Sequence, residues 1–286
     1  MTQHRSRTIL ALACYAVSAL ACRAASDDWA VAVVAYVRGA NAANGYTNAH
    51  AALGEAARTT LDWNEPAAVT VINPAWLPSQ IVSLGDGGYL ALEMGADVVN
   101  EDDPLHPYGV DLLVYGNALF GAASTAGFYA APWVGISQEP AEIWVSADTQ
   151  TWCRARWRWT DSNACADSYM PTQALDGDGN PSDYLRPVNP ALLTNEWFET
   201  EPPWSYSNTV AAYEGAAGGC PVDLSDLLTA AGAPTNLAAA RYVKLVDVAG
   251  SGSTEIDAVA RVAPVPESGV VCGLLLVMWC SARRHE

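Results

Sequence analysis

Residues 152–159 read Trp152-Cys153-Arg154-Ala155-Arg156-Trp157-Arg158-Trp159 and alternate apolar with basic side chains from Cys153 onward. Successive side chains of a β-strand point to opposite faces, so this stretch predicts a strand with one buried face and one face in water. Other short runs rich in β-branched and aromatic residues recur along the chain. Together they predict about eight strands, at 31–37, 68–72, 89–94, 111–115, 142–146, 153–159, 241–248 and 256–262.

Polar turn clusters, rather than amphipathic helices, separate these runs. Two of them are Gly85-Asp86-Gly87-Gly88 and Asp176-Gly177-Asp178-Gly179-Asn180-Pro181. Short strands joined by turns, without long helices between them, indicate an antiparallel β-sandwich of the jelly-roll kind. We expect one such domain over residues 27–263, with a long loop insertion at about 161–219 that is rich in Pro, Trp, Asn and Gly.

Residues 1–26 predict a signal peptide. Basic Arg5 and Arg7 precede an apolar run at 9–21 and then small residues, which is the order of a secretory signal. The run is shorter than the roughly 20 apolar residues that span a bilayer. We therefore expect a signal peptidase to remove this segment and the rest of the chain to be exported. Lipidation at Cys22 is a weaker alternative, because Ala19 stands where a larger aliphatic residue is usual.

Residues 264–286 form a second terminal segment with its own pattern. They hold Val265-Pro266-Glu267-Ser268, an apolar run at 269–282 and the basic pair Arg283-Arg284. This order resembles the PEP-CTERM sorting signal, with Ser268 where that signal has its second proline. The resemblance implies processing by an exosortase-like enzyme and delivery to the cell envelope, outer surface or extracellular matrix. The apolar run would form a helix of about 21 Å, shorter than a hydrocarbon core of about 30 Å, so this transmembrane helix is expected to hold the tail in the membrane only until processing.

The body between the two ends is strongly acidic. It has nine basic and 29 acidic residues, a net charge of about −20, against −17 for the whole chain. Such a charge repels nucleic-acid phosphates and anionic lipid surfaces, so we expect no nucleic-acid partner. It suits calcium, whose ligands are carboxylate and carbonyl oxygens, and it equally suits solubility outside the cell.

Three cysteines belong to the body: Cys153, Cys165 and Cys220. In an oxidising compartment one disulfide is expected among them, with one thiol left over. Spacing alone leaves every pairing open.

Several ordered motifs in the body resemble bacterial surface proteins with discoidin-like, galactose-binding-like domains. The first are Ala52-Leu53-Gly54 and the segments at 83–92 and 110–119. The later ones are the Val-Ser-x-Asp turn within 142–148 and the closing strands at 240–248 and 255–259. The resemblance spans roughly residues 50–262 and implies a galactose-binding-like sandwich.

Two places in the body are candidates for a structural calcium ion. The first is a loop that places oxygen-bearing side chains at alternate positions, as calcium requires, and its members are Asp176, Asp178, Asn180 and Asp183. An ordinary solvated turn explains the same pattern. The second is Asp257, because the resemblance implies a calcium ion between the first loop and the closing strand. The alternative for Asp257 is pairing with a neighbouring loop amide.

An aromatic-rich segment among prolines predicts a sugar-stacking platform, because flat apolar sugar faces pack on aromatic rings. Its candidate ligand-binding residues are Trp197, Trp204 and Tyr206, and Trp133 is a further candidate. The alternative is that these rings pack loops onto the sandwich.

No catalytic motif stands out in the body. His50 and His106 are its only histidines, and it has no Gly-x-Ser-x-Gly elbow, His-Glu-x-x-His pair or phosphate-binding loop. We therefore expect a non-enzymatic, envelope-sorted surface or matrix protein. The first alternative is a protein that binds extracellular polysaccharide. The second is a glycan hydrolase, which stays open because the catalytic carboxylate pair of such an enzyme is recognised by its separation in space and not by a sequence motif.

Overall fold

The computed structural model describes residues 27–123, 130–156, 170–192, 204–248, 250 and 252–264. The predicted signal peptide and the sorting motif at 265–268 with Arg283 and Arg284 lie outside these residues. Within them, no helix combines the length and the apolar character needed to cross a membrane.

The described chain is mainly β. Its strands are β1 (Ala30–Val37), β2 (Thr59–Asp62), β3 (Glu65–Ala68), β4 (Val82–Ser83), β5 (Tyr89–Val99), β6 (Leu112–Gly116), β7 (Leu119–Ala122), β8 (Trp133–Ser137), β9 (Ala141–Ser146), β10 (Cys153–Ala155), β11 (Cys220–Val222), β12 (Leu227–Leu228), β13 (Pro234–Thr235), β14 (Ala239–Asp247) and β15 (Glu255–Arg261). The helices are α3 (Tyr206–Tyr213) and the short 3₁₀ turns η1 (Ala49–Ala52), η2 (Pro107–Gly109) and η3 (Pro190–Leu192).

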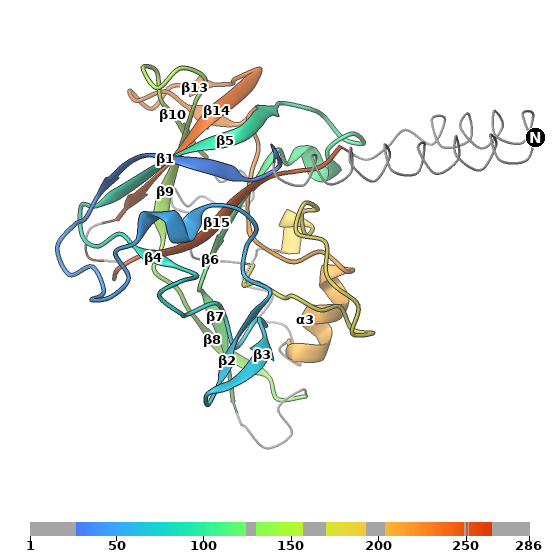
Figure 1. Ribbon diagram of the computed structural model, residues 1–286. Coiled ribbons are helices and arrows are strands. Elements are labelled where there is room, and N and C mark those ends of the chain that lie inside the picture. The colour runs from blue at the N-terminus through green and yellow to red at the C-terminus, as the bar shows by residue number, and fades with distance from the viewer. Residues whose placement is uncertain are drawn as a thin grey trace, which may run out of the picture.

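Two antiparallel sheets form the body (Figure 1). The larger has the order β1-β5-β14-β9-β10-β12-β13, and the smaller has the order β11-β6-β15-β4. Two further hairpins, β2-β3 and β7-β8, lie on the same side of the sheets as α3 in Figure 1. Every strand pair is antiparallel, so the predicted mainly-β antiparallel class is confirmed.

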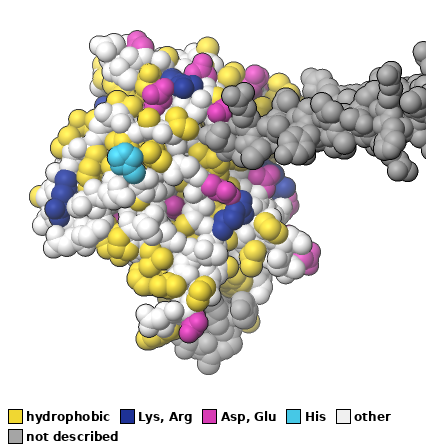
Figure 2. Space-filling view, viewed as in Figure 1, with side chains coloured by type: hydrophobic (Ala, Val, Ile, Leu, Met, Phe, Trp, Pro, Cys, Tyr) yellow, Lys and Arg dark blue, Asp and Glu magenta, His cyan; other side chains and the backbone are white. Residues whose placement is uncertain are grey.

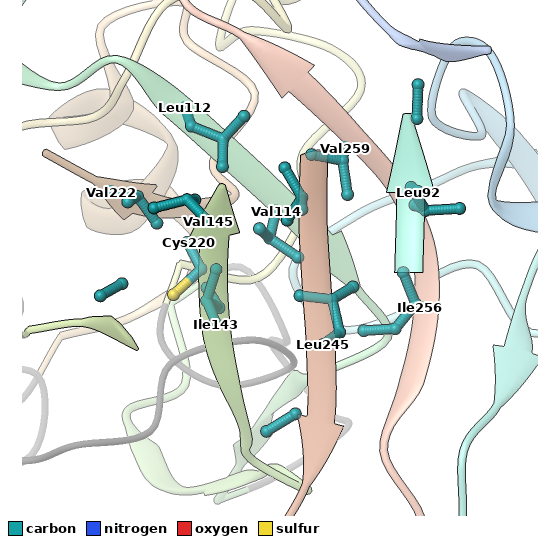
Figure 3. Packing of buried hydrophobic residues seen from close by; sticks show 14 of the residues in the cluster. Leu92, Leu112, Val114, Ile143, Val145, Cys220, Val222, Leu245, Ile256 and Val259 are labelled. Atoms are coloured by element: carbon teal, nitrogen blue, oxygen red, sulfur yellow. The ribbon is translucent and has the colours of Figure 1, made fainter. Parts of the chain in front are cut away.

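One apolar core lies between the two sheets. Figure 3 shows side chains of the larger sheet, Leu92, Ile143, Val145 and Leu245, packed with side chains of the smaller sheet, Leu112, Val114, Val222, Ile256 and Val259. Each is nearly inaccessible to solvent, and burying an aliphatic side chain of this size contributes about 1.5–3 kcal/mol. This packing is consistent with a β-sandwich.

The alternation that predicted the fold class is present where the structure describes it. Cys153 and Ala155 are 4% and 7% exposed, whereas Arg154 is half-buried and Arg156 is exposed. Cys153 pairs with Val145 of β9, which places the apolar face of β10 on the core. Trp157 and Trp159 lie outside the described residues.

The strand predicted at 68–72 is wrong beyond its first residue. Val69 and Val71 are fully buried, which explains the apolar pattern, but the chain here does not join a ladder. The backbone N–H of Val71 donates to the Gln173 side chain (3.3 Å), and its carbonyl accepts from Phe120 (2.8 Å). A buried loop whose polar groups find such partners has the same periodicity as a strand. The expected eight strands are too few: the described residues form fifteen, and several of these have only two to four residues.

The structure excludes two of the three disulfide pairings that the sequence left open. Cys153 is a free, buried thiol, so both pairings that include it are wrong. Cys220 is disulfide-bonded, and its partner lies outside the described residues.

Candidate functional site

A cleft of about 450 Å³ opens where the turn at 176–181 meets helix α3. The predicted loop insertion supplies most of its wall, and Thr70 completes it from the segment after β3. The lining residues are Thr70, Gln173, Leu175, Asp176, Gly177, Gly179, Tyr206, Ser207, Val210 and Ala211. The cleft therefore joins the turn proposed for calcium to the segment proposed for sugar stacking.

The turn at 176–181 is held together by the carboxylate of Asp176. Its Oδ1 accepts the backbone N–H groups of Asp178 (2.9 Å) and Asn180 (2.8 Å), and its Oδ2 accepts from the Asn180 side chain (3.1 Å). Gly179, with φ of +82°, allows the chain to reverse. The hydrogen bonds that Asn180 donates, first from its backbone N–H and then from its side chain, hold the pKa of Asp176 below its ordinary value. Asp176 is therefore an ionised hydrogen-bond acceptor in the lining of the cleft.

Tyr206 is the first residue of α3, and two side-chain hydrogen bonds fix this helix on the neighbouring segments. Its buried Thr209 hydroxyl accepts from the Trp133 indole N–H (2.8 Å), and the Tyr213 hydroxyl donates to the carbonyl of Pro171 (2.8 Å). The Tyr206 hydroxyl accepts from the amide of Gln173 (3.0 Å). Since Gln173 is itself held by the backbone of Val71 and Leu175, the Tyr206 side chain is oriented before any ligand binds.

Among the described sugar-binding candidates, Tyr206 alone lines the cleft. Tyr206 lines the cleft, while Trp204 is partly buried against the core and is not among the lining residues. Trp197 lies outside the described residues. The placement of Trp133 in the platform is wrong: it is 2% exposed and stacks on Phe120 with ring centroids 5.1 Å apart.

Two of the four predicted calcium ligands, Asp176 and Asp183, accept hydrogen bonds from within the protein. Asp176 uses both carboxylate oxygens inside the turn, and Asp183 accepts the backbone N–H of Leu185 (2.9 Å). Asp178 and Asn180 are exposed to solvent. Nowhere in the described part of the chain do three or more His, Cys, Asp or Glu side chains come close enough to hold a metal ion.

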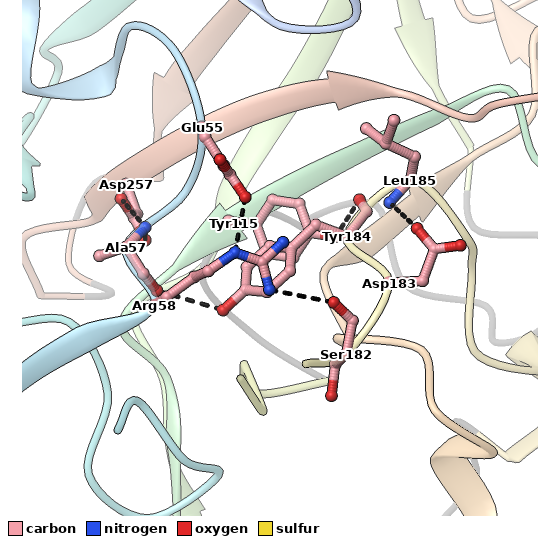
Figure 4. A network of polar contacts seen from close by, with 9 residues as sticks. All are labelled: Glu55, Ala57, Arg58, Tyr115, Ser182, Asp183, Tyr184, Leu185 and Asp257. Atoms are coloured by element: carbon pink, nitrogen blue, oxygen red, sulfur yellow. Dashed lines mark hydrogen bonds and ion pairs between the residues drawn. The ribbon is translucent and has the colours of Figure 1, made fainter. Parts of the chain in front are cut away.

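Asp257, the other calcium candidate, lies on β15 against the segment that precedes β2. Its two oxygens share one donor, the backbone N–H of Ala57, at 2.9 and 3.2 Å (Figure 4). The side chain is 3% exposed, and burial raises its pKa to about 8. Arg58 covers this region with its guanidinium 4.3 Å from the ring centroid of Tyr184.

Sequence reasoning missed several lining residues, above all Gln173 and Thr70. Neither belongs to a recognisable motif. They join the site because the chain at 70–71 packs beside residue 173, a contact between segments about a hundred positions apart.

Neither a protein-family model nor a curated protein matches this chain.

Proposed function

We propose that the chain is an exported, non-catalytic surface protein whose β-sandwich binds extracellular carbohydrate in the cleft between the turn at 176–181 and α3. One observation carries this proposal: the cleft combines an aromatic ring with an ionised acceptor and a buried amide, Tyr206, Asp176 and Gln173.

The cleft has the size and chemistry of a small sugar site. Pockets for small ligands measure roughly 300–1,000 Å³, so about 450 Å³ suits one or two sugar rings. The Tyr206 ring offers an apolar surface for a pyranose face. The Asp176 Oδ2, which accepts one hydrogen bond within the turn, keeps a second lone pair for a sugar hydroxyl group. On the face of the molecule shown in Figure 2, charged side chains stand in small groups among apolar and neutral ones.

The lining argues against glycan hydrolysis. Canonical glycosidases need two carboxyl groups flanking the bond that breaks. Asp176 is the single carboxylate among the lining residues, and its oxygens already accept hydrogen bonds from the turn. Binding without chemistry is the function that this arrangement supports.

The galactose-binding-like fold belongs to the same proposal. Its support is the pair of antiparallel sheets that share one core, with the last two strands, β14 and β15, placed in opposite sheets. A calcium ion at Asp257 is proposed from the resemblance alone.

Replacing Tyr206 by Ala will lower the affinity for the bound glycan at least tenfold, because the stacking ring is removed. A glycan array with the wild-type chain identifies the ligand, and calorimetry then compares the variants. Tyr206→Phe keeps the ring and will retain most of the affinity. Trp63→Ala removes an indole that is 92% exposed and lies outside the cleft, so it serves as the matched control. A wild-type chain that binds no glycan, or equal affinity in Tyr206→Ala, would overturn the proposal.

We also propose that the chain is exported by its segment at 1–26 and sorted to the cell envelope by its segment at 264–286. Mass spectrometry of the mature chain from its native cell will find a first residue near position 24–27 and a chain that ends before the apolar run at 269–282. Replacing Arg283 and Arg284 by Ala will lower the yield of the processed form. Recovery of an intact tail on the mature surface protein would contradict processing and leave the cleft proposal standing.

A further inference from the structure

Lys244 is the only lysine in the chain, and it occupies the middle of the larger sheet. Its neighbours along β14, Val243 and Leu245, are fully buried in the core, so the Lys244 side chain points to the outer face. On that face it pairs with Trp144 of β9, which in turn pairs with Arg154 of β10.

Two indole rings enclose the Lys244 ammonium group. Its Nζ lies 4.4 Å from the ring centroid of Trp152 and 5.4 Å from that of Trp144, both within the range of cation–π attraction. The rings are themselves fixed. The Trp144 indole N–H donates to Glu142 (2.9 Å), and that of Trp152 donates to the carbonyl of Thr149 (3.0 Å).

The ammonium group has no ion-pair or hydrogen-bond partner among the described residues, although the chain carries 31 acidic residues. The second cation on this face, Arg154, is already paired with Glu142 at 2.8 Å. Burial lowers the pKa of Lys244, because water is partly excluded and no carboxylate replaces it. The half-buried ammonium group has three N–H donors and lies beside two indole rings. A ligand that fits it carries an anionic group, which accepts hydrogen bonds from the ammonium, on a flat and partly apolar body that packs against an indole.

We propose that Lys244, Trp144 and Trp152 form a second carbohydrate site, specific for a sugar that carries a carboxylate. The carboxylate of a uronic acid accepts hydrogen bonds from Nζ, and the C–H face of its ring packs against an indole. This site is separate from the cleft, since no lining residue is shared and α3 lies away from β9 and β14 in Figure 1.

The negative charge of the chain restricts the occupant to glycans with few uronic acids. A dense polyanion would be repelled by the body, whose net charge is about −20. A single carboxylate interacts mainly with charges near it, because at physiological ionic strength charges more than about 8 Å away are largely screened. Lys244 is therefore the dominant charge that such a ligand meets.

Chemical labelling tests the site directly, because Lys244 and the N-terminal amine are the only primary amines of the protein. Acetylation by an N-hydroxysuccinimide ester, followed by mass spectrometry, gives the rate at Lys244. We expect a galactose trimer that ends in one galacturonic acid to slow this rate at least fivefold and a neutral galactose trimer to leave it unchanged. Equal protection by both trimers, or protection by neither, would overturn the proposal.

Calorimetry with the same acidic trimer separates this site from the cleft. Lys244→Gln will lower the affinity at least tenfold, whereas Lys244→Arg, which keeps the charge, will retain most of it. Both variants should fold, since the ammonium group has no polar partner to lose. Tyr206→Ala will bind the acidic trimer as the wild type does. Loss of acidic-trimer binding in Tyr206→Ala, with Lys244→Gln unaffected, would assign the ligand to the cleft instead.

Discussion

Replacing Asp257 by Asn will flatten the dependence of stability on pH between about pH 4 and pH 8. In the native protein the buried carboxyl has a pKa of about 8, whereas in the unfolded chain an aspartate titrates near 4. Over that interval the native state binds one proton more than the unfolded state, so stability falls as pH rises. Each unit is worth about 1.4 kcal/mol, which sets an upper bound of roughly 5 kcal/mol for the whole interval.

Guanidinium unfolding at several pH values will measure this difference. In Asp257→Asn the amide oxygen can still accept the Ala57 N–H, and no charge has to be buried. The variant should therefore be more stable than the wild type at pH 8 and similar to it at pH 4. Asp178→Asn, which changes an exposed carboxylate, is the matched control and should follow the wild-type curve. Parallel curves for wild type and Asp257→Asn would contradict the prediction.

The same variant tests the proposed calcium ion. An ion bound at Asp257 would stabilise the ionised carboxylate and raise the melting temperature of the wild type, but not that of Asp257→Asn. No shift of the wild type at millimolar calcium would remove the metal from this position.

Replacing Trp133 by Ala will cost about 3–5 kcal/mol of unfolding free energy. The indole is buried, stacks on Phe120 and donates its N–H to Thr209 of α3, so the change leaves both a cavity and an unpaired buried hydroxyl. Trp133→Phe keeps the stacked ring and should lose only part of this free energy. Because Trp133 connects β8 to α3, the variant will also loosen the cleft.

Chemical denaturation of the three proteins measures the effect, and Trp63→Ala is the control. Trp63 is 92% exposed at the turn between β2 and β3, so its removal should change stability by less than about 0.5 kcal/mol. A loss below about 1 kcal/mol for Trp133→Ala would contradict the prediction.

Sequence reasoning identified individual residues of the candidate site without identifying the site. The Asp/Gly turn identified Asp176, and the neighbouring aromatic residues identified Tyr206. Each of these patterns lies within a few residues of the side chain that it identifies. Their meeting in one cleft depends on Gln173, which bonds to Val71 and to Tyr206. Such a contact has no local signal, because side chains at 71, 173 and 206 are independent in sequence.

Local sequence determined the mainly-β class and the buried face of β10, because the alternation of side chains is a property of the strand itself. Residues 152–155 carried that information correctly, as the burial of Cys153 and Ala155 shows. Tertiary structure alone decided that 69–72 is a buried loop, that Trp133 belongs to the core and that Lys244 has aromatic neighbours instead of a carboxylate. Burial and partner choice depend on which distant segments pack together, and that is a property of the folded chain.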